Sequence, residues 1–183
     1  MCFDTESSAF YPWRYGFQSP EVVRGYFEDR TVRFDCGIIY DAASKRYHEF
    51  LSGREHAGLM VDMLSRADEL VTFNRTRFDF IVLETQVGRE RIDSTLRRIP
   101  HHDVSGWRGV FELRALAGRV LQPDAVTILD DLKPHRDRYL ASGLSDFLSE
   151  KLAKCRCDVE LTYAAFEQCP DLHASCCRGS RVT

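Results

Sequence analysis

The segment 32–40 constrains the fold most, because its apolar residues first alternate and then run together (VRFDCGIIY). Alternation followed by a continuous apolar run is typical of a β-strand that is buried in a sheet. The next residues, 41–44, predict a hairpin turn, and 46–51 predict the return strand. An antiparallel pair of strands is therefore the first part of the predicted sheet.

Helical and β-rich patterns alternate over the rest of the chain. Further strands are predicted at 1–4, 70–73 and 98–104. Apolar residues at helical spacing predict helices at 56–68, 77–87, 111–121 and 145–169. Ser145 suits the N-cap of the last helix, and the segment 122–137 is turn-rich. This order predicts an α/β fold in which helices flank a mixed sheet.

The length and the composition favour one domain. The chain has 183 residues, of which 44% are hydrophobic, and this is enough apolar material for one sizeable core. Pro170 follows the last predicted helix, so the domain is predicted at 1–169 and a flexible tail at 170–183.

Two further features bear on the cellular environment. Residues 1–6 lack the basic start and apolar core of a signal peptide, and no apolar run reaches the roughly 20 residues of a membrane span. We therefore expect a soluble, cytoplasmic protein with no membrane partner. The seven cysteines are an odd number and are expected to be mainly reduced thiols. A zinc cluster near the C-terminus is disfavoured, because the Cys155–Cys157 spacing does not fit a common zinc knuckle.

Acidic residues recur in three short segments. In the first, FDTE, Asp4 and Glu6 are two residues apart and share one side of a strand. In the second, ADELVTFN followed by RFD, a helix, a short strand and a polar turn place Asp79 at a sheet edge, where α/β proteins commonly bind ligands. In the third, KCRCDVELT, Lys154 and Asp158 share one face of a helix.

Together and in this order, the three segments resemble the three motifs of the DEDD family of 3′–5′ exonucleases, over roughly residues 1–168. The resemblance implies a ribonuclease-H-like fold and hydrolysis of phosphodiester bonds at the 3′ end of a nucleic acid, with single strands as the expected substrate. It also implies two Mg²⁺ or Mn²⁺ ions held by Asp4, Glu6, Asp79 and Asp158. The matching positions imply that the substrate is contacted by Thr5, Asn74, Arg77 and Phe78.

Elementary electrostatics agrees with a metal centre. Two carboxylates about 4 Å apart repel by about 4 kcal/mol at an effective dielectric constant near 20. Bound divalent cations remove this cost, activate water and stabilise a leaving oxygen. Ligands that are all oxygen favour Mg²⁺ or Mn²⁺ over zinc.

One position departs from the family's pattern. The family places a Tyr four residues before the last Asp, or a His five residues before it, and this chain has Lys154 and Ala153 there. Lys154 could orient water or phosphate as a cation, or act as a base if its pKa were lowered. It could instead occupy the place of a metal ion and leave an inactive module that binds nucleic acid or a replication or repair partner. In a third interpretation, Tyr163 or His135 positions the water.

Other segments leave alternatives open. The connection 7–30 is rich in aromatic residues, including Trp13 and Tyr15, which could stack on unpaired bases or cover the sheet edge. The basic stretch 89–102 could follow a phosphate backbone or consist of solvated arginines. Asp103 is expected to be a structural turn residue. The net charge of −3 argues against a strong non-specific grip on nucleic acid, and a polymerase or helicase partner is a further expectation.

Overall fold

The computed structural model describes residues 1–8, 21–22, 24–25, 32–73, 78–105 and 112–169. Its centre is a five-stranded mixed sheet in the order β3-β2-β1-β4-β5. Strand β1 is antiparallel to β2 and parallel to β4, and β2 runs against all the others. The strands are β1 (Cys2–Ser7), β2 (Phe34–Asp41), β3 (Arg46–Phe50), β4 (Leu70–Thr72) and β5 (His101–Asp103). The α/β class and the mixed sheet are confirmed.

The predicted hairpin between β2 and β3 is confirmed, and Asp41 shapes its turn. The Asp41 carboxylate accepts hydrogen bonds from the backbone N–H of Ala43 (3.1 Å) and the hydroxyl of Ser44 (2.6 Å). Lys45 then takes a left-handed conformation with φ at 54°. Such side chain to backbone bonds are the usual way in which Asp stabilises a tight turn.

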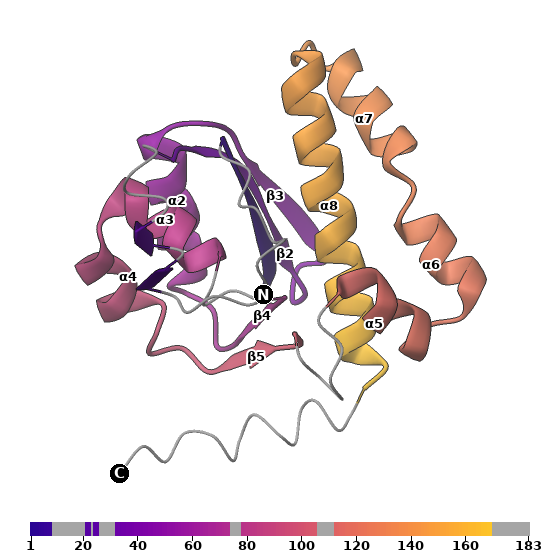
Figure 1. The fold of residues 1–183 in the computed structure, drawn as a ribbon, viewed down its shortest axis with the longest axis horizontal. Helices are drawn as coiled ribbons and strands as arrows, with labels where there is room; N and C mark the ends of the chain where they lie inside the picture. Colours follow the sequence, from indigo (N-terminus) through magenta and orange to yellow (C-terminus); the bar gives the residue numbers. More distant parts are fainter. Residues whose placement is uncertain (9–20, 23, 26–31, 74–77, 106–111, 170–183) are drawn as a thin grey trace.

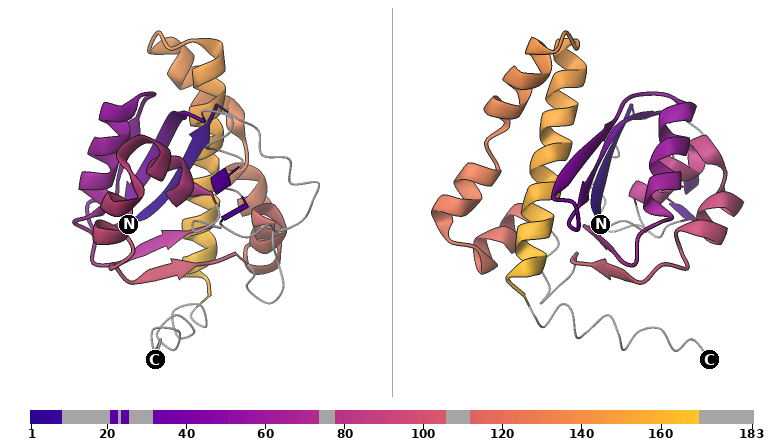
Figure 2. Two further views of the ribbon diagram at one scale, coloured as in Figure 1. Left: turned by 60° about the vertical axis from the view of Figure 1, so that its left-hand side comes forward. Right: turned by 180° about the vertical axis from the view of Figure 1, so that it is seen from behind.

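Helices cover both faces of the sheet (Figures 1 and 2). One face packs against α2 (Arg54–Leu64) and α3 (Asp79–Val87), with α4 (Arg89–Thr95) beside α3. The other face packs against the long helix α8 (Asp146–Glu167). The outer layer on α8 consists of α5 (Leu113–Val120), α6 (Pro123–Leu129) and α7 (Leu132–Ala141).

The alternation along β1 divides its side chains between the two layers. Phe3 belongs to the apolar cluster beneath α2 and α3, whereas Cys2 belongs to the cluster beneath α8. Because successive side chains of a strand point to opposite faces, Asp4 and Glu6 share the face that α8 covers. The strand thus presents its two carboxylates to the helix that carries Asp158.

Two sequence expectations need correction. The segment 122–137 is helical over most of its length, because α6 and α7 lie there. Its prolines do not interrupt these helices: Pro123 is the first residue of α6, and Pro134 lies in the first turn of α7. A proline needs no N–H partner at such positions. Helix α4, which the sequence analysis did not predict, follows α3 directly after Gly88, whose φ is 89°.

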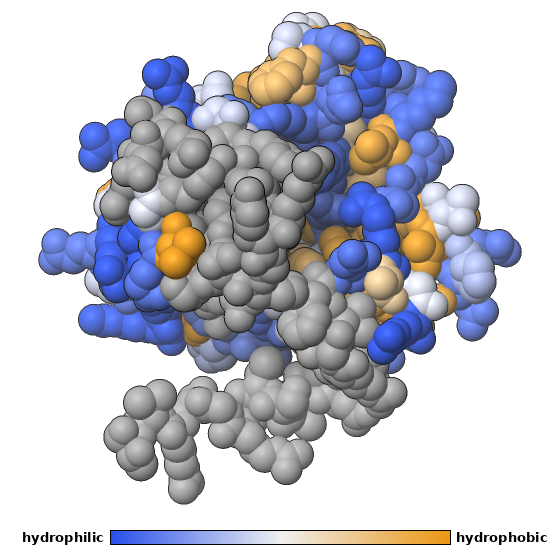
Figure 3. Space-filling view, in the orientation of Figure 1, coloured by the Kyte–Doolittle hydropathy of each residue, from blue (hydrophilic) through white to orange (hydrophobic). Residues whose placement is uncertain are grey.

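The described residues that are visible in Figure 3 are mainly hydrophilic, and their apolar side chains form scattered groups. The large exposed apolar residues belong to different elements, for example Leu59 on α2 and Ile128 on α6. Scattered exposed apolar residues are ordinary and do not by themselves mark a binding site. In the part of the chain that the structure describes, no helix has the length and apolar character needed to cross a membrane.

Candidate metal centre

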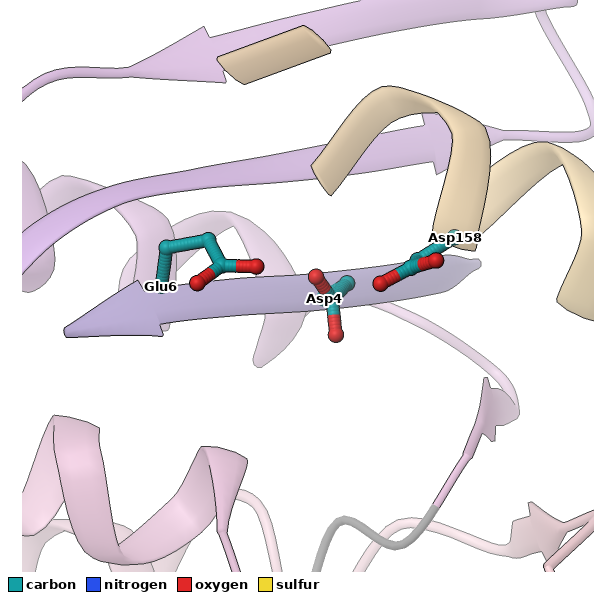
Figure 4. Close-up of side chains that lie close together, drawn as sticks. All are labelled: Asp4, Glu6 and Asp158. Atoms are coloured by element: carbon teal, nitrogen blue, oxygen red, sulfur yellow. The ribbon is translucent and has the colours of Figure 1, made fainter. Parts of the chain in front are cut away.

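Three carboxylates converge between β1 and α8. One oxygen atom each of Asp4, Glu6 and Asp158 lies within 4.8 Å of the others. Figure 4 shows Asp4 and Glu6 projecting from one strand, and Asp158 approaching from the helix. The acids of the first and third motifs, more than 150 positions apart in the sequence, therefore lie together, whereas Asp79 of the second motif is not in the group.

Small side chains allow α8 to lie close to β1 at this place. The Cys155 thiol donates a hydrogen bond to the Asp4 carbonyl oxygen (3.2 Å), and the Cys2 thiol donates one to the Val159 carbonyl oxygen (3.6 Å). Both cysteines are fully buried. These two hydrogen bonds connect α8 to β1 at residues before and after Asp158 in the sequence.

Asp79 lies outside this group of three. Its side chain is buried, and Oδ1 accepts hydrogen bonds from the backbone N–H (2.9 Å) and the hydroxyl (2.8 Å) of Thr5. Asp79 is the first residue of α3, whose N-cap is Phe78, so it does not act as the cap residue. Thr5, expected at the substrate, is also buried, and its donors hold Asp79.

Burial makes the negative charge of Asp4 costly. Desolvation is the largest cause that raises the pKa of Asp4 well above its usual value, and the charges of Asp79 and Asp158 raise it further. Oδ2 of Asp4 is buried and has no hydrogen-bond partner among the described residues. A buried acceptor without a donor costs about 1–3 kcal/mol, and more when it is charged. This oxygen is therefore a position at which a cation would be stabilising.

Lys154 is the cation nearest the cluster. Its ammonium contacts the Glu6 carboxylate and lies 3.2 Å from Asp158 Oδ2. Desolvation would lower the pKa of Lys154, but the charges of Glu6, Asp158 and Asp4 outweigh it and raise that pKa. Burial raises the pKa of Glu6 as well, and Lys154 opposes this rise. A lysine with a raised pKa stays protonated, which argues against the interpretation of Lys154 as a base.

The other candidates for water positioning contact different groups. Tyr163 lies about two and a half helical turns after Lys154, which places it on the opposite side of α8. Its ring packs edge-on against Tyr40, with the ring centroids 4.8 Å apart. His135 lies 3.3 Å from Glu160. Neither contact points to a role at the three carboxylates.

Two basic residues near the cluster were not predicted from the sequence. Arg114 on α5 lies 3.3 Å from Asp158 Oδ1 and also pairs with Asp130. Lys151 lies one turn before Lys154 and contacts both Asp35 and the Ser7 carbonyl oxygen at 2.5 Å. The spacing of Lys151 and Lys154 could have indicated the second of these residues, but Arg114 depends on how α5 packs against α8.

The remaining candidates have the following surroundings. Phe78 packs against the apolar cluster beneath α2 and α3. Asp103 accepts hydrogen bonds from the N–H (3.0 Å) and hydroxyl (2.7 Å) of Ser105, as expected of a turn residue. In the basic stretch, Arg91 pairs with Asp62 and Arg97 pairs with Glu84. Outside the described residues lie Asn74, Arg77, Trp13, Tyr15 and the segment 170–183.

The donor set fits a hard divalent cation. All the converging atoms are carboxylate oxygens, which suit Mg²⁺ or Mn²⁺. The described cysteines are buried free thiols, and no group of them converges as these acids do within the described part of the chain. Cys176 and Cys177 lie outside it. The described part of the chain therefore offers an oxygen site.

No protein-family model matches this chain, and no curated protein matches its sequence significantly.

Proposed function

We propose that the protein is a metal-dependent 3′–5′ exonuclease with Asp4, Glu6 and Asp158 at its metal centre. The observation that carries the proposal is the convergence of these carboxylates together with the buried, unbonded Oδ2 of Asp4. The five-stranded mixed sheet between helices is compatible with the ribonuclease-H-like fold that the motifs imply. Asp79 supports the centre from the other side of β1 through Thr5.

The reaction is hydrolysis of the last phosphodiester bond of a strand. The oxygen of a water molecule forms a bond to phosphorus, the bond from phosphorus to the 3′ oxygen breaks, and that oxygen leaves with a proton. Mg²⁺ or Mn²⁺, two ions by the resemblance, would activate the water and stabilise the leaving oxygen. The three carboxylates hold the cations, and the Lys154 ammonium attracts the phosphate and orients it beside them.

The test uses the full chain with single-stranded DNA and RNA labelled near the 5′ end, so that stepwise shortening from the 3′ end is visible. We expect shortening with Mg²⁺ or Mn²⁺, none with EDTA, and none in the Asp4→Ala or Asp158→Ala variants. Asp124→Ala, which changes an exposed acid on α6, is the matched control. Activity that survives both EDTA and the two cluster variants would rule out this mechanism.

A second candidate function follows from the position of Lys154. Because its ammonium contacts both Glu6 and Asp158, it could take the place of a cation and leave a module that binds nucleic acid or a partner without cleaving it. Lys154→Tyr separates the two functions. A gain of nuclease activity supports the non-catalytic module, whereas a loss supports a lysine adapted to catalysis. Co-purification with a polymerase or helicase would test the expected partner.

A further inference from the structure

We propose that Arg114 binds the substrate phosphate at the metal centre and that Asp130 positions its guanidinium for this task. The inference deepens the proposed nuclease function and rests on it. It adds a residue from a third element, α5, to a site otherwise made by β1 and α8.

The backbone of Arg114 is fixed against α8. The preceding residue, Leu113, packs with Ala117 and with Leu161 of α8 in a small apolar cluster. This contact anchors the first turn of α5 beside the helix that carries Asp158. Arg114 therefore reaches the acidic cluster from a defined position rather than from a free chain end.

Asp130 holds one edge of the guanidinium. Nε of Arg114 donates to Asp130 Oδ2 (2.9 Å), and Nη2 lies 2.7 Å from Asp130 Oδ1. Asp130 is itself fixed at the C-terminal end of α6. Because a guanidinium has five N–H groups, this pair leaves donors for a further acceptor, and Nη2 also lies 3.3 Å from Asp158 Oδ1.

Exposure and chemistry point to an anion that enters from solvent. The Arg114 side chain is 47% exposed, whereas that of Asp158 is 13% exposed. The guanidinium is thus more exposed than the half-buried acids beside it. Its planar donors match phosphate oxygens, often through two parallel hydrogen bonds. A cation bound at Asp158 would neutralise that carboxylate and weaken its attraction for Arg114. The guanidinium of Arg114 would then bind the phosphate in preference to Asp158.

The alternative is that Arg114 only clamps α5, α6 and α8 together. The two roles are separated by Arg114→Ala and Arg114→Lys, with Arg119→Ala, an exposed arginine at the end of the same helix, as the matched control. Three quantities are measured: kcat and KM for single-stranded oligonucleotides, the salt dependence of oligonucleotide binding in Ca²⁺, and Mn²⁺ affinity. The thermal midpoint of each variant reports the structural contribution.

We expect Arg114→Ala to lower kcat/KM by about 10- to 100-fold, the loss of one hydrogen-bonded charge, with Mn²⁺ affinity unchanged or higher. The slope of the logarithm of the oligonucleotide binding constant against the logarithm of the salt concentration should decrease in size by about one, the value for one phosphate contact. Arg114→Lys should keep part of the activity that Arg114→Ala loses. Asp130→Asn should raise KM and lower kcat/KM by less than Arg114→Ala does.

Suppose that the parent protein cleaves with metal, and that Arg114→Ala and Arg119→Ala have equal kinetics and equal salt slopes. This result would overturn the role of Arg114 and leave the nuclease proposal intact. The role of Arg114 would also be overturned if the activity of Arg114→Ala fell only as far as its lowered thermal midpoint explains. A parent that shows no metal-dependent cleavage would overturn the nuclease proposal and this inference with it.

Discussion

Asp4 is half-buried and Asp79 is buried, on opposite sides of one strand, and their surroundings differ. Thr5 donates two hydrogen bonds to Asp79 Oδ1, whereas Oδ2 of Asp4 has no donor among the described residues. Burial is the largest cause of a raised pKa in both. For Asp79 the Thr5 bonds limit the rise, and the pKa reaches about 7. The protein itself thus supplies hydrogen bonds to Asp79 and leaves one Asp4 oxygen without a donor among the described residues, which is the oxygen at which we propose a cation.

The largest effect is expected from neutralising the acid without a donor. Asp4→Asn should lower metal-dependent cleavage at least about 1,000-fold, because bound metal contributes several kcal/mol to the transition state. Asp79→Asn should cost less, since Asp79 supports the centre and is not one of its three converging ligands. Steady-state rates of the two variants measure the difference. Equal losses would remove the distinction between the two aspartates.

A smaller effect should follow when Asp79 is made to resemble Asp4. Thr5→Val removes the hydroxyl donor and should lower the free energy of unfolding by about 1.5–3 kcal/mol at pH 8, the usual worth of a hydrogen bond to a charged group. Thr5→Ser keeps the hydroxyl and serves as the control. Denaturant unfolding measures both. If the valine and serine variants prove equally stable, the hydroxyl contributes nothing to Asp79.

The pH dependence of the metal-free protein should show the smallest effect. The folded-state pKa values of Asp4, Glu6 and Asp79 lie above their ordinary values, so the folded state binds more protons than the unfolded state. The stability from these groups is complete below pH about 4 and is lost as the pH rises through about 7 and beyond. In EDTA, the thermal midpoint should fall by at least about 3 °C between pH 5.5 and pH 8.

Asp4→Asn should flatten this pH profile, because it removes a carboxyl group whose pKa is raised by desolvation. A metal-free parent whose midpoint rises between pH 5.5 and pH 8 would contradict the expected sign. Asp124→Asn, which alters an exposed acid, should leave the profile unchanged.

The sequence predicted the elements that local patterns control. The β2–β3 hairpin follows from apolar alternation and from Asp41 in the turn, and α8 begins after Ser145, whose hydroxyl accepts a hydrogen bond from the Leu148 N–H (3.3 Å). The helices α6 and α7 could not be recognised in the same way. Their prolines are common turn signals, and only their places in the first helical turns make them compatible with helix.

The site was predictable only as far as its residues lie in the motifs. The i, i+2 spacing of Asp4 and Glu6 places both on one strand face, and Lys154 lies one turn from Asp158 on a helix. The separation of Asp79 from this group depends on which face of β1 carries Thr5. The approach of Arg114 depends on the packing of α5 against α8, and no local pattern encodes this contact.

The central claim is that the three carboxylates form a cation site, and titration of the metal-free protein with Mn²⁺ tests it most directly. Electron paramagnetic resonance of free Mn²⁺ gives the binding constant at pH 8 for the parent, Asp4→Asn, Asp158→Asn and the control Asp124→Asn. The account predicts binding by the parent and the control, and a loss of at least about tenfold in affinity in both cluster variants. Equal Mn²⁺ binding in all four proteins would contradict it, as would a parent that binds none.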